Sequence, residues 1–379
     1  MNRLASYIGI IAALSLGIFI ASLFDSQTTL HTSTTTSSST LSVIPSISPL
    51  PPEEDGGASV TPSVTTIPKK KTTPPPTVTP VITSAPPVAK PISTPTPSPT
   101  PVTTEALDAS ASVLRNALVN IICYAPQGSV LHSISGSGVF IDPKGIILTN
   151  AHIAQYFLFA NQGISCAIRS GGPAIDKYTA ALIYISPLWI KENASLLTQS
   201  TPSGTGEYDF ALLAVTKSST SAPVPAQFPF IPLAQEPPLP GTPIVIGSYG
   251  AQFLGSNQVQ SSLFPTIVFG SIKKVYTFVR TTIDVLALGG SAAAQEGSSG
   301  GGVANALGML VGTITTSTIE GDTSTRSLSA ITASYIRAEY ASESGKALDL
   351  LLTEPTSISI ANFASRIPAL EAMLEAHLP

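Results

Sequence analysis

Short apolar runs separated by turn residues dominate the chain between residues 135 and 332. The runs are rich in β-branched residues, and Gly, Pro, Ser and Asn stand between them, which is typical of strands joined by tight turns. No fixed repeat of roughly 20 to 50 residues accompanies them, so the pattern indicates an all-β sandwich or barrel rather than a solenoid or a propeller. The predicted strands lie within residues 135–150, 165–170, 180–186, 209–215, 242–250, 265–279, 308–315 and 327–332.

Helical patterns flank these strands. Residues 109–126 begin as a short helical pattern and end in an apolar, β-branched run, which predicts a helix leading directly into a strand. Residues 334–355 and 361–379 predict helices after the last strand.

The N-terminal segment contains no charged side chain from Leu4 to Phe24, which is long enough to cross a bilayer as a helix. Arg3 precedes this span and Asp25 follows it, so the positive end is expected to stay in the cytoplasm. We therefore predict a membrane anchor over residues 1–24, with the rest of the chain outside the cytoplasm. The alternative is a cleaved signal peptide, which would make the protein secreted.

Residues 25–104 are rich in Pro, Ser and Thr and contain no aromatic residue. Half of the chain's 34 prolines fall between Pro45 and Pro101. A segment of this composition has nothing with which to build a core, so we predict a disordered linker that tethers the following domain.

The overall charge gives no support for a nucleic-acid partner. Charged residues make up 11% of the chain, and the formal net charge is −4. Nucleic-acid binding normally requires a basic excess, so we exclude that class.

Three short stretches supply a candidate nucleophile, base and acid. QEGSSGGGV places Ser299 in a Gly-rich turn, and TNAH places His152 at a strand-to-helix junction. GEYDFALLAV places Asp209 at the head of an apolar strand, where a carboxylate needs hydrogen-bond donors. Each residue alone also fits an ordinary structural role. The other histidines lie in the linker (His31), in an ordinary turn-to-strand stretch (His132) and next to the C-terminus (His377).

Together these stretches resemble the trypsin/chymotrypsin-like serine peptidases, and most closely their bacterial HtrA/Deg-type branch. The residues that carry the resemblance are GSGVFID and GIILTNAH around His152, DFALL at Asp209 and GSSGGGV around Ser299, in the family's order. LPGTPIVIGSYG and GMLVGTIT also resemble strands of the family's second barrel, so the similarity covers about residues 110–340. The chain departs from the family pattern at Ser298 and Gly302, and only 39 residues follow Tyr340, too few for a PDZ domain.

The resemblance implies a double six-stranded β-barrel over residues 105–340 followed by a helical tail over residues 341–379. It makes His152 the general base, Asp209 the residue that fixes its tautomer and Ser299 the nucleophile. The backbone N–H groups of Gly297 and Ser299 would then form the oxyanion hole.

The resemblance also implies the substrate-binding residues. Ala293 occupies the place of the acid that selects Lys or Arg in the family, and Thr315 is expected to line the same pocket. Because a neutral pocket would leave a cation desolvated and unpaired, we expect cleavage after small or aliphatic residues.

The two cysteines, Cys123 and Cys166, lie in predicted strands of the first barrel, and export would place them in an oxidising space. We predict a disulfide between them; two buried free thiols are the alternative. Neither the cysteines nor the histidines have metal-ligand spacing, so no metal or organic cofactor is expected.

These features predict a membrane-tethered extracytoplasmic serine endopeptidase that acts on proteins or peptides. One alternative is an inactive peptidase-fold protein that binds peptides or partners at the cell surface. Another is a non-enzymatic stalk protein, in which His152, Asp209 and Ser299 would lie far apart.

Overall fold

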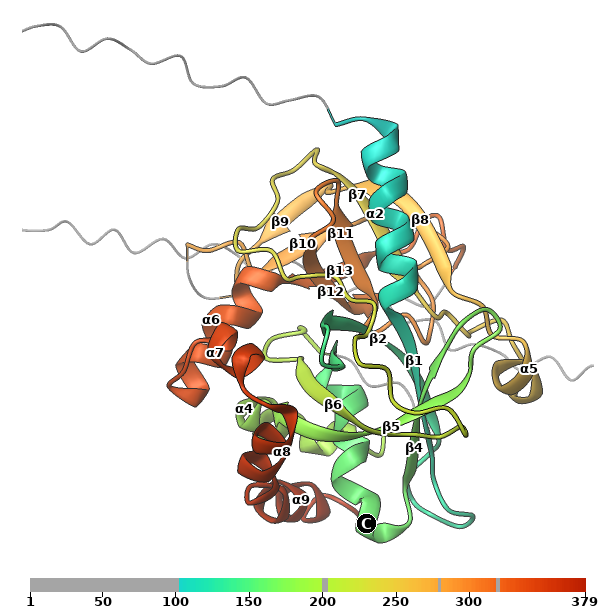
Figure 1. Ribbon diagram of the computed structural model, residues 1–379, viewed down its shortest axis with the longest axis vertical. Coiled ribbons are helices and arrows are strands. Elements are labelled where there is room, and N and C mark those ends of the chain that lie inside the picture. Colours follow the sequence, from blue (N-terminus) through green and yellow to red (C-terminus); the bar gives the residue numbers. More distant parts are fainter. Residues whose placement is uncertain (1–101, 200–203, 279–280, 318–320) are drawn as a thin grey trace, which may run out of the picture. The chain divides into compact units, whose positions relative to one another are not determined.

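The first half of the fold is a closed barrel of six antiparallel strands. The computed structural model of the protein describes residues 102–379, except 200–203, 279–280 and 318–320. The barrel order is β1-β2-β3-β6-β5-β4, which leaves no unpaired edge (Figure 1). The strands are β1 (Leu118–Tyr124), β2 (Ile134–Asp142), β3 (Ile146–Thr149), β4 (Ser165–Ser170), β5 (Ile175–Ile185) and β6 (Ala211–Ser218).

The second half is a seven-stranded sheet with the order β8-β7-β11-β12-β13-β10-β9. Its strands are β7 (Pro243–Ser248), β8 (Thr266–Ser271), β9 (Lys274–Tyr276), β10 (Val285–Ala287), β11 (Gly302–Asn305), β12 (Leu310–Ser317) and β13 (Leu328–Thr332). Two β-sheets of this kind confirm the trypsin-like arrangement, but the prediction of a second closed six-stranded barrel is wrong in detail.

The difference arises at one kink. The predicted single strand over residues 265–279 is divided into β8 and β9, which lie at opposite edges of the sheet and are separated only by Ile272 and Lys273. The N–H of Ile272 still donates to the carbonyl of Thr242 on the β7 side (3.0 Å), whereas the N–H of Lys273 donates to Ala287 in β10 (2.8 Å). The chain therefore changes its pairing partner from β7 to β10 between Ile272 and Lys273. The two edge strands, β8 and β9, are connected by the backbone and not by hydrogen bonds between them.

Helix α2 (Thr104–Ala117) precedes β1 without a loop, as the sequence predicted. The hydroxyl of Thr103 accepts a hydrogen bond from the N–H of Ala106 and caps the helix. The helix ends at the β-branched run of β1, where Leu118 is already extended. The helix packs beside β7 and β11 of the second sheet (Figure 1). Its buried residues are Ser110, Leu114 and Ala117.

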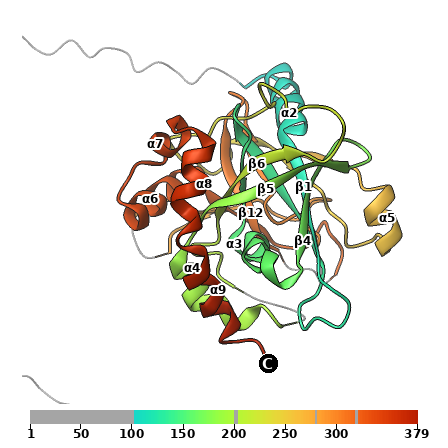
Figure 2. The same cartoon turned by 60° about the horizontal axis from the view of Figure 1, so that its bottom comes forward.

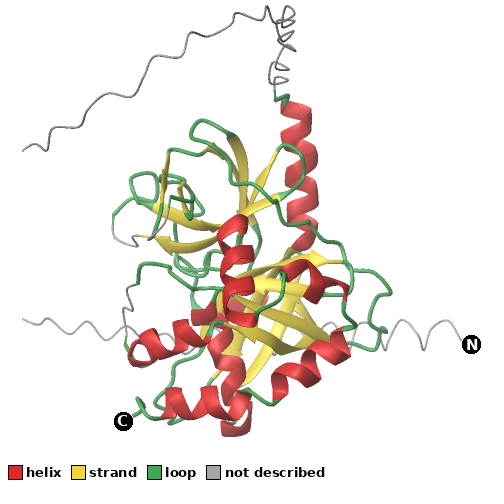
Figure 3. Ribbon diagram, turned by 90° about the vertical axis from the view of Figure 1, so that its left-hand side faces the viewer, coloured by secondary structure: helices red, strands yellow, loops and turns green. Residues whose placement is uncertain are grey.

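Most of the remaining helices lie around the first barrel (Figures 2 and 3), whereas α6 contacts β12 and β13 of the second sheet. Helix α8 contacts β5, and α9 contacts α4, η1 and η2. The helices are α3 (Ala151–Ala154), η1 (Gln155–Gln162), α4 (Pro187–Asn193), η2 (Ala194–Leu196), α5 (Ser256–Ser261), α6 (Ala333–Ser344), α7 (Leu348–Thr353), α8 (Thr356–Ala364) and α9 (Ile367–Glu375).

Within the residues that the structure describes, no helix has both the length and the apolar character needed to cross a bilayer. The predicted anchor over residues 1–24 and almost all of the predicted linker over residues 25–104 lie outside the described residues.

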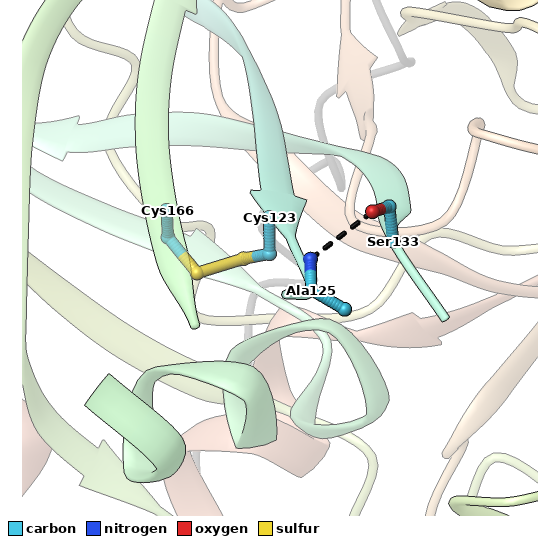
Figure 4. The surroundings of a disulfide bond; sticks show 4 residues. All are labelled: Cys123, Ala125, Ser133 and Cys166. Carbon is cyan, nitrogen blue, oxygen red and sulfur yellow. Dashed lines mark hydrogen bonds between the residues drawn. A yellow bond between two sulfur atoms is a disulfide. The ribbon is translucent and has the colours of Figure 1, made fainter. Parts of the chain in front are cut away.

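The predicted disulfide is confirmed. Cys123 in β1 and Cys166 in β4 face each other directly across the two paired strands and are covalently joined. Close to this bond, where β1 ends, the N–H of Ala125 donates to the hydroxyl of Ser133 at 3.0 Å (Figure 4).

Candidate active site

His152 is placed by a β-hairpin and a single helical turn. In the hairpin between β2 and β3, the carboxylate of Asp142 accepts a hydrogen bond from the N–H of Lys144 at 2.8 Å. Gly145 then has φ +87°, a conformation that favours glycine. The helical turn α3 begins directly after β3, and it leaves the His152 side chain 29% exposed.

Asp209 lies buried beneath the His152 ring. One carboxylate oxygen of Asp209, Oδ2, is 2.8 Å from His152 Nδ1 and accepts a hydrogen bond from the Thr315 hydroxyl at 2.7 Å. The other oxygen, Oδ1, accepts the backbone N–H of His152 at 3.0 Å. A tight turn delivers the carboxylate: Tyr208 has φ +57°, and the N–H of Asp209 donates to the carbonyl of Gly206 at 3.2 Å.

Two opposing effects set the pKa of Asp209. Burial of the carboxylate raises its pKa, because charge is disfavoured in the protein interior. The electrostatic interaction with His152 and the hydrogen bonds from His152 and Thr315 favour the ionised form, and they hold the pKa of Asp209 below its usual range. Asp209 is therefore a charged acceptor that orients the imidazole.

The loop that carries Ser299 is held by its carbonyl groups. Gly297 and Gly300 have φ +86° and +83°, and a Cβ on Gly297 would lie 2.7 Å from the carbonyl oxygen of Tyr249, so this loop requires glycine there. Each of the four successive carbonyls of residues 296–299 accepts a hydrogen bond. The bonds are Ala251 N–H to Glu296 (2.8 Å), the Ser137 hydroxyl to Gly297 (2.7 Å), Gly301 N–H to Ser298 (2.9 Å) and Ser137 N–H to Ser299 (2.7 Å).

The N–H groups of the same loop alternate between bonded and unbonded. The N–H of Ser298 donates to the carbonyl of Gln295 at 3.2 Å, and that of Gly300 donates to Ile314 at 2.9 Å. The alternate N–H groups, those of Gly297 and Ser299, have no acceptor in the described part of the chain. C=O and N–H point in opposite directions in a trans peptide, so the bond from Ala251 to Glu296 turns the Gly297 N–H away from Ala251.

Contacts of the loop bring it to the strands that precede His152. Gly300 lies so close to these strands that a Cβ there would be 2.0 Å from the carbonyl oxygen of Ser137 and 2.5 Å from the Thr149 hydroxyl. Ser299 is half-buried, and within the described ranges no hydrogen bond joins its hydroxyl to the His152 ring. The structure therefore joins His152, Asp209 and Thr315 directly, and it brings the Ser299 loop against the segment that leads to His152.

The residues assigned to the substrate pocket are both buried. Ala293 is fully buried, and the Thr315 hydroxyl is directed at Asp209. Sequence reasoning missed the buried guanidinium of Arg326, whose Nη1 donates to the carbonyl of Ala294 (2.7 Å) and to the side chain of Gln252 (2.6 Å).

Sequence reasoning also missed Asn150 and Ser137. The side-chain amide of Asn150 donates to the carbonyl of Asp209 at 2.8 Å, and the Ser137 hydroxyl donates to the carbonyl of Gly297 in the Ser299 loop. Both residues lie inside motifs that the sequence already singled out, but their partners are far away in the chain. Among the described residues there is no group of three or more His, Cys, Asp or Glu side chains that could hold a metal ion.

Comparison with known proteins gives one family match and a set of similar solved structures. Residues 136–312 match the family model of the trypsin-like peptidase domain, a range that contains all three candidate residues. No curated protein sequence matches the chain significantly. Among solved structures, the chain is similar to the active form of the Rv3671c protease from M. tuberculosis, at 18% identity over 68% of this chain and 94% of that chain, with a TM-score of 0.39. The inactive form of that protease is similar at 17% identity over 64% of this chain and 99% of that chain, with a TM-score of 0.39.

Proposed function

We propose that this chain, which carries a trypsin-like serine peptidase domain, hydrolyses peptide bonds through His152, Asp209 and Ser299. The observation that carries the proposal is the pattern of backbone hydrogen bonds around Ser299. Every carbonyl from residue 296 to residue 299 is occupied, while the N–H groups of Gly297 and Ser299 have no acceptor within the residues described. Two such donors, fixed in place and unpaired, suit an oxygen that acquires negative charge during the reaction.

The contacts of Asp209 support the role of His152 as the base. With the proton on Nδ1 donated to Asp209, Nε2 of His152 is left as the acceptor for the Ser299 hydroxyl proton. The oxygen of Ser299 attacks the scissile carbonyl, and the resulting oxyanion is bound by the N–H groups of Gly297 and Ser299. His152 then returns the proton to the leaving amine, which breaks the peptide bond and leaves an acyl-enzyme. Water, activated by the same imidazole, hydrolyses the ester and regenerates Ser299.

The proposed substrates are proteins or peptides cut after small or aliphatic residues. Ala293 provides no carboxylate for a substrate cation. The Arg326 guanidinium, bonded to the neighbouring Ala294, adds a positive charge that disfavours Lys or Arg further. Digestion of a peptide library checks this preference, and dominant cutting after Lys or Arg would show it to be wrong.

We also propose that the domain is tethered to the membrane on its extracytoplasmic side. The uncharged span from Leu4 to Phe24 supports the anchor, and the Cys123–Cys166 disulfide fits an oxidising compartment. N-terminal sequencing of the mature protein from cells is expected to recover residues before Leu4. A mature start after Ala21 would instead show that the segment is a cleaved signal peptide.

The catalytic proposal is tested with a fluorophosphonate probe on the purified protein. An unassisted serine hydroxyl is a weak nucleophile, so selective labelling of Ser299 requires a base within reach. We expect Ser299→Ala and His152→Ala to abolish labelling, and Asp209→Asn to lower turnover by about 10⁴ because it stabilises the wrong tautomer.

Ser298→Ala is the matched control. Ser298 is the neighbouring serine, but its buried hydroxyl accepts a hydrogen bond from Ser248 at 3.1 Å, so most labelling is expected to survive its removal. Labelling that maps to Ser298 would show that the nucleophile is misassigned. A folded parent protein that does not react at all would favour the inactive, peptide-binding alternative.

A further inference from the structure

We infer that Ser137 is a positioning residue whose buried hydroxyl holds the Ser299 loop in its oxyanion-binding shape. The inference rests on the proposed function, because it concerns the donors of the same site. Ser137 belongs to β2 of the first barrel, whereas the loop it contacts precedes β11 of the second sheet.

Ser137 holds two of the four carbonyls that define the loop. Its hydroxyl donates to the carbonyl of Gly297, and its backbone N–H donates to the carbonyl of Ser299, both at 2.7 Å. These two carbonyls flank the peptide between Ser298 and Ser299, which carries one of the unpaired N–H groups. A single residue therefore fixes the loop on both sides of that donor.

The other bonds of Ser137 reach the surroundings of the loop. The N–H of Tyr249 donates to the Ser137 hydroxyl at 2.8 Å, and the Thr149 hydroxyl donates to the Ser137 carbonyl at 2.7 Å. Tyr249 stands two residues before Ala251, whose N–H holds the carbonyl of Glu296. Thr149 is the last residue of β3, directly before the segment that carries His152. Ser137 thus links the Ser299 loop to the Tyr249–Ala251 segment and to β3, the strand that leads to His152.

A serine suits this position because the side chain must donate and accept at once in a fully buried site. Alanine would leave the Gly297 carbonyl and the Tyr249 N–H without this partner. Gly297, at φ +86°, has no side chain to restrict the released peptide. β2 is closely packed on both sides of Ser137, because a Cβ at Gly136 or Gly138 would lie 2.7 Å or 2.8 Å from isoleucine side chains.

The test compares Ser137→Ala with Ser110→Ala in the full chain. Ser110 is also a buried serine whose hydroxyl donates to a backbone carbonyl, that of Asn305, at 2.7 Å, so its removal has a similar structural cost. Loss of one oxyanion donor lowers kcat by about 10² to 10³. Because Ser137→Ala loosens the donors without removing them, we expect it to lower kcat by about tenfold or more, with little change in KM. Ser110→Ala is expected to leave kcat nearly unchanged. Ser137→Cys, of similar size and with a weak donor and acceptor, is expected to be intermediate.

Amide hydrogen exchange over residues 290–302 gives a readout that does not require turnover. We expect exchange in this segment to become faster in Ser137→Ala and to stay as in the parent in Ser110→Ala. Unchanged exchange and kcat in Ser137→Ala, or equal losses in both alanine variants, would overturn the inference. If the parent cleaves nothing but Ser137→Ala still loosens the segment, the proposed function fails and the positioning role stands.

Discussion

The charge of Asp209 persists in the protein interior because hydrogen-bond donors face both of its oxygens. The Thr315 hydroxyl is one of these donors, at 2.7 Å from Oδ2. Thr315→Val keeps the shape of the side chain but removes the donor, and a hydrogen bond to a charged group contributes about 1.5–3 kcal/mol. We therefore expect the free energy of unfolding at pH 7 to fall by roughly that amount, together with a slower rate of Ser299 labelling.

The effect has a defined pH dependence. The pKa of Asp209 is lower in the folded protein than the roughly 3.9 of an unfolded chain. Its ionised form therefore stabilises the fold above about pH 4, and this contribution disappears as the pH falls through the folded-state pKa. The difference between parent and Thr315→Val in denaturant unfolding is expected to be constant from pH 5 to 7 and to shrink at lower pH.

Thr313 supplies the matched control on the same strand. It is as buried as Thr315, but its hydroxyl has no hydrogen-bond partner within the described residues. Thr313→Val removes an unsatisfied polar group, so it is expected to leave stability unchanged or to raise it. Equal destabilisation by the two valine variants would mean that the bond to Asp209 is not the cause.

Single residues also show where sequence reasoning stops. The sequence predicted the local elements that carry His152 and Asp209, and the structure joins the two side chains. The sequence did not predict the hydrogen bond from Thr315 to Asp209, nor those from Ser137 to the Ser299 loop. These bonds depend on how two separate sheets pack against each other. Such contacts have no local sequence signal, because serine and threonine in strands are common.

Among the elements, the strands were largely predictable and their pairing was not. Residues 265–279 have one continuous apolar pattern, which predicts one strand. The kink between β8 and β9 follows from a change of partner from β7 to β10, and the pattern of side chains does not record partners. Helix α2 was predicted because a helical period and a β-branched run adjoin in the sequence, and the change falls between Ala117 and Leu118.

The disulfide is the one covalent link between elements, and its contribution can be measured. Cys123 and Cys166 are separated by 43 residues, and closing a loop of that length stabilises the folded state by about 4 kcal/mol on the chain-entropy model. We expect reductant to lower the free energy of unfolding of the parent by an amount of that order. A Cys123→Ala/Cys166→Ala variant is the control, because reductant is expected to have no effect on it. A parent that unfolds identically with and without reductant would contradict the prediction.

On the scale of the whole molecule, the C-terminal helices belong to the packing of the first barrel. The predicted tail over residues 341–379 contains α7, α8 and α9. One face of these helices is buried, with the apolar residues Leu348, Leu351, Phe363, Leu370 and Leu374. Arg337 and Asp349 join α6 to α7 through a 2.6 Å ion pair, and the N–H groups and carbonyls of the helices are bonded internally. Sequence periodicity predicted these helices but not the surface they cover, because an apolar face does not specify its partner.

Two variants of α8 distinguish a helical layer that folds with the barrel from one that is only attached to it. Phe363 and Ile358 lie on the same helix, α8, but Phe363 is 5% exposed whereas Ile358 is 49% exposed. Phe363→Ala would leave a cavity between α8 and the barrel and is expected to lower the free energy of unfolding by about 3–5 kcal/mol. Ile358→Ala changes an exposed side chain on the same helix and is expected to stay within about 0.5 kcal/mol of the parent.

Chemical denaturation followed by fluorescence of Trp189, the only tryptophan and a buried residue of α4, reports on both variants. Because α4 contacts α9, a layer that unfolds together with the barrel gives one transition that shifts as a whole in Phe363→Ala. A separate early transition, with the main one unmoved, would instead mean that these helices are an appendage whose loss the barrel tolerates.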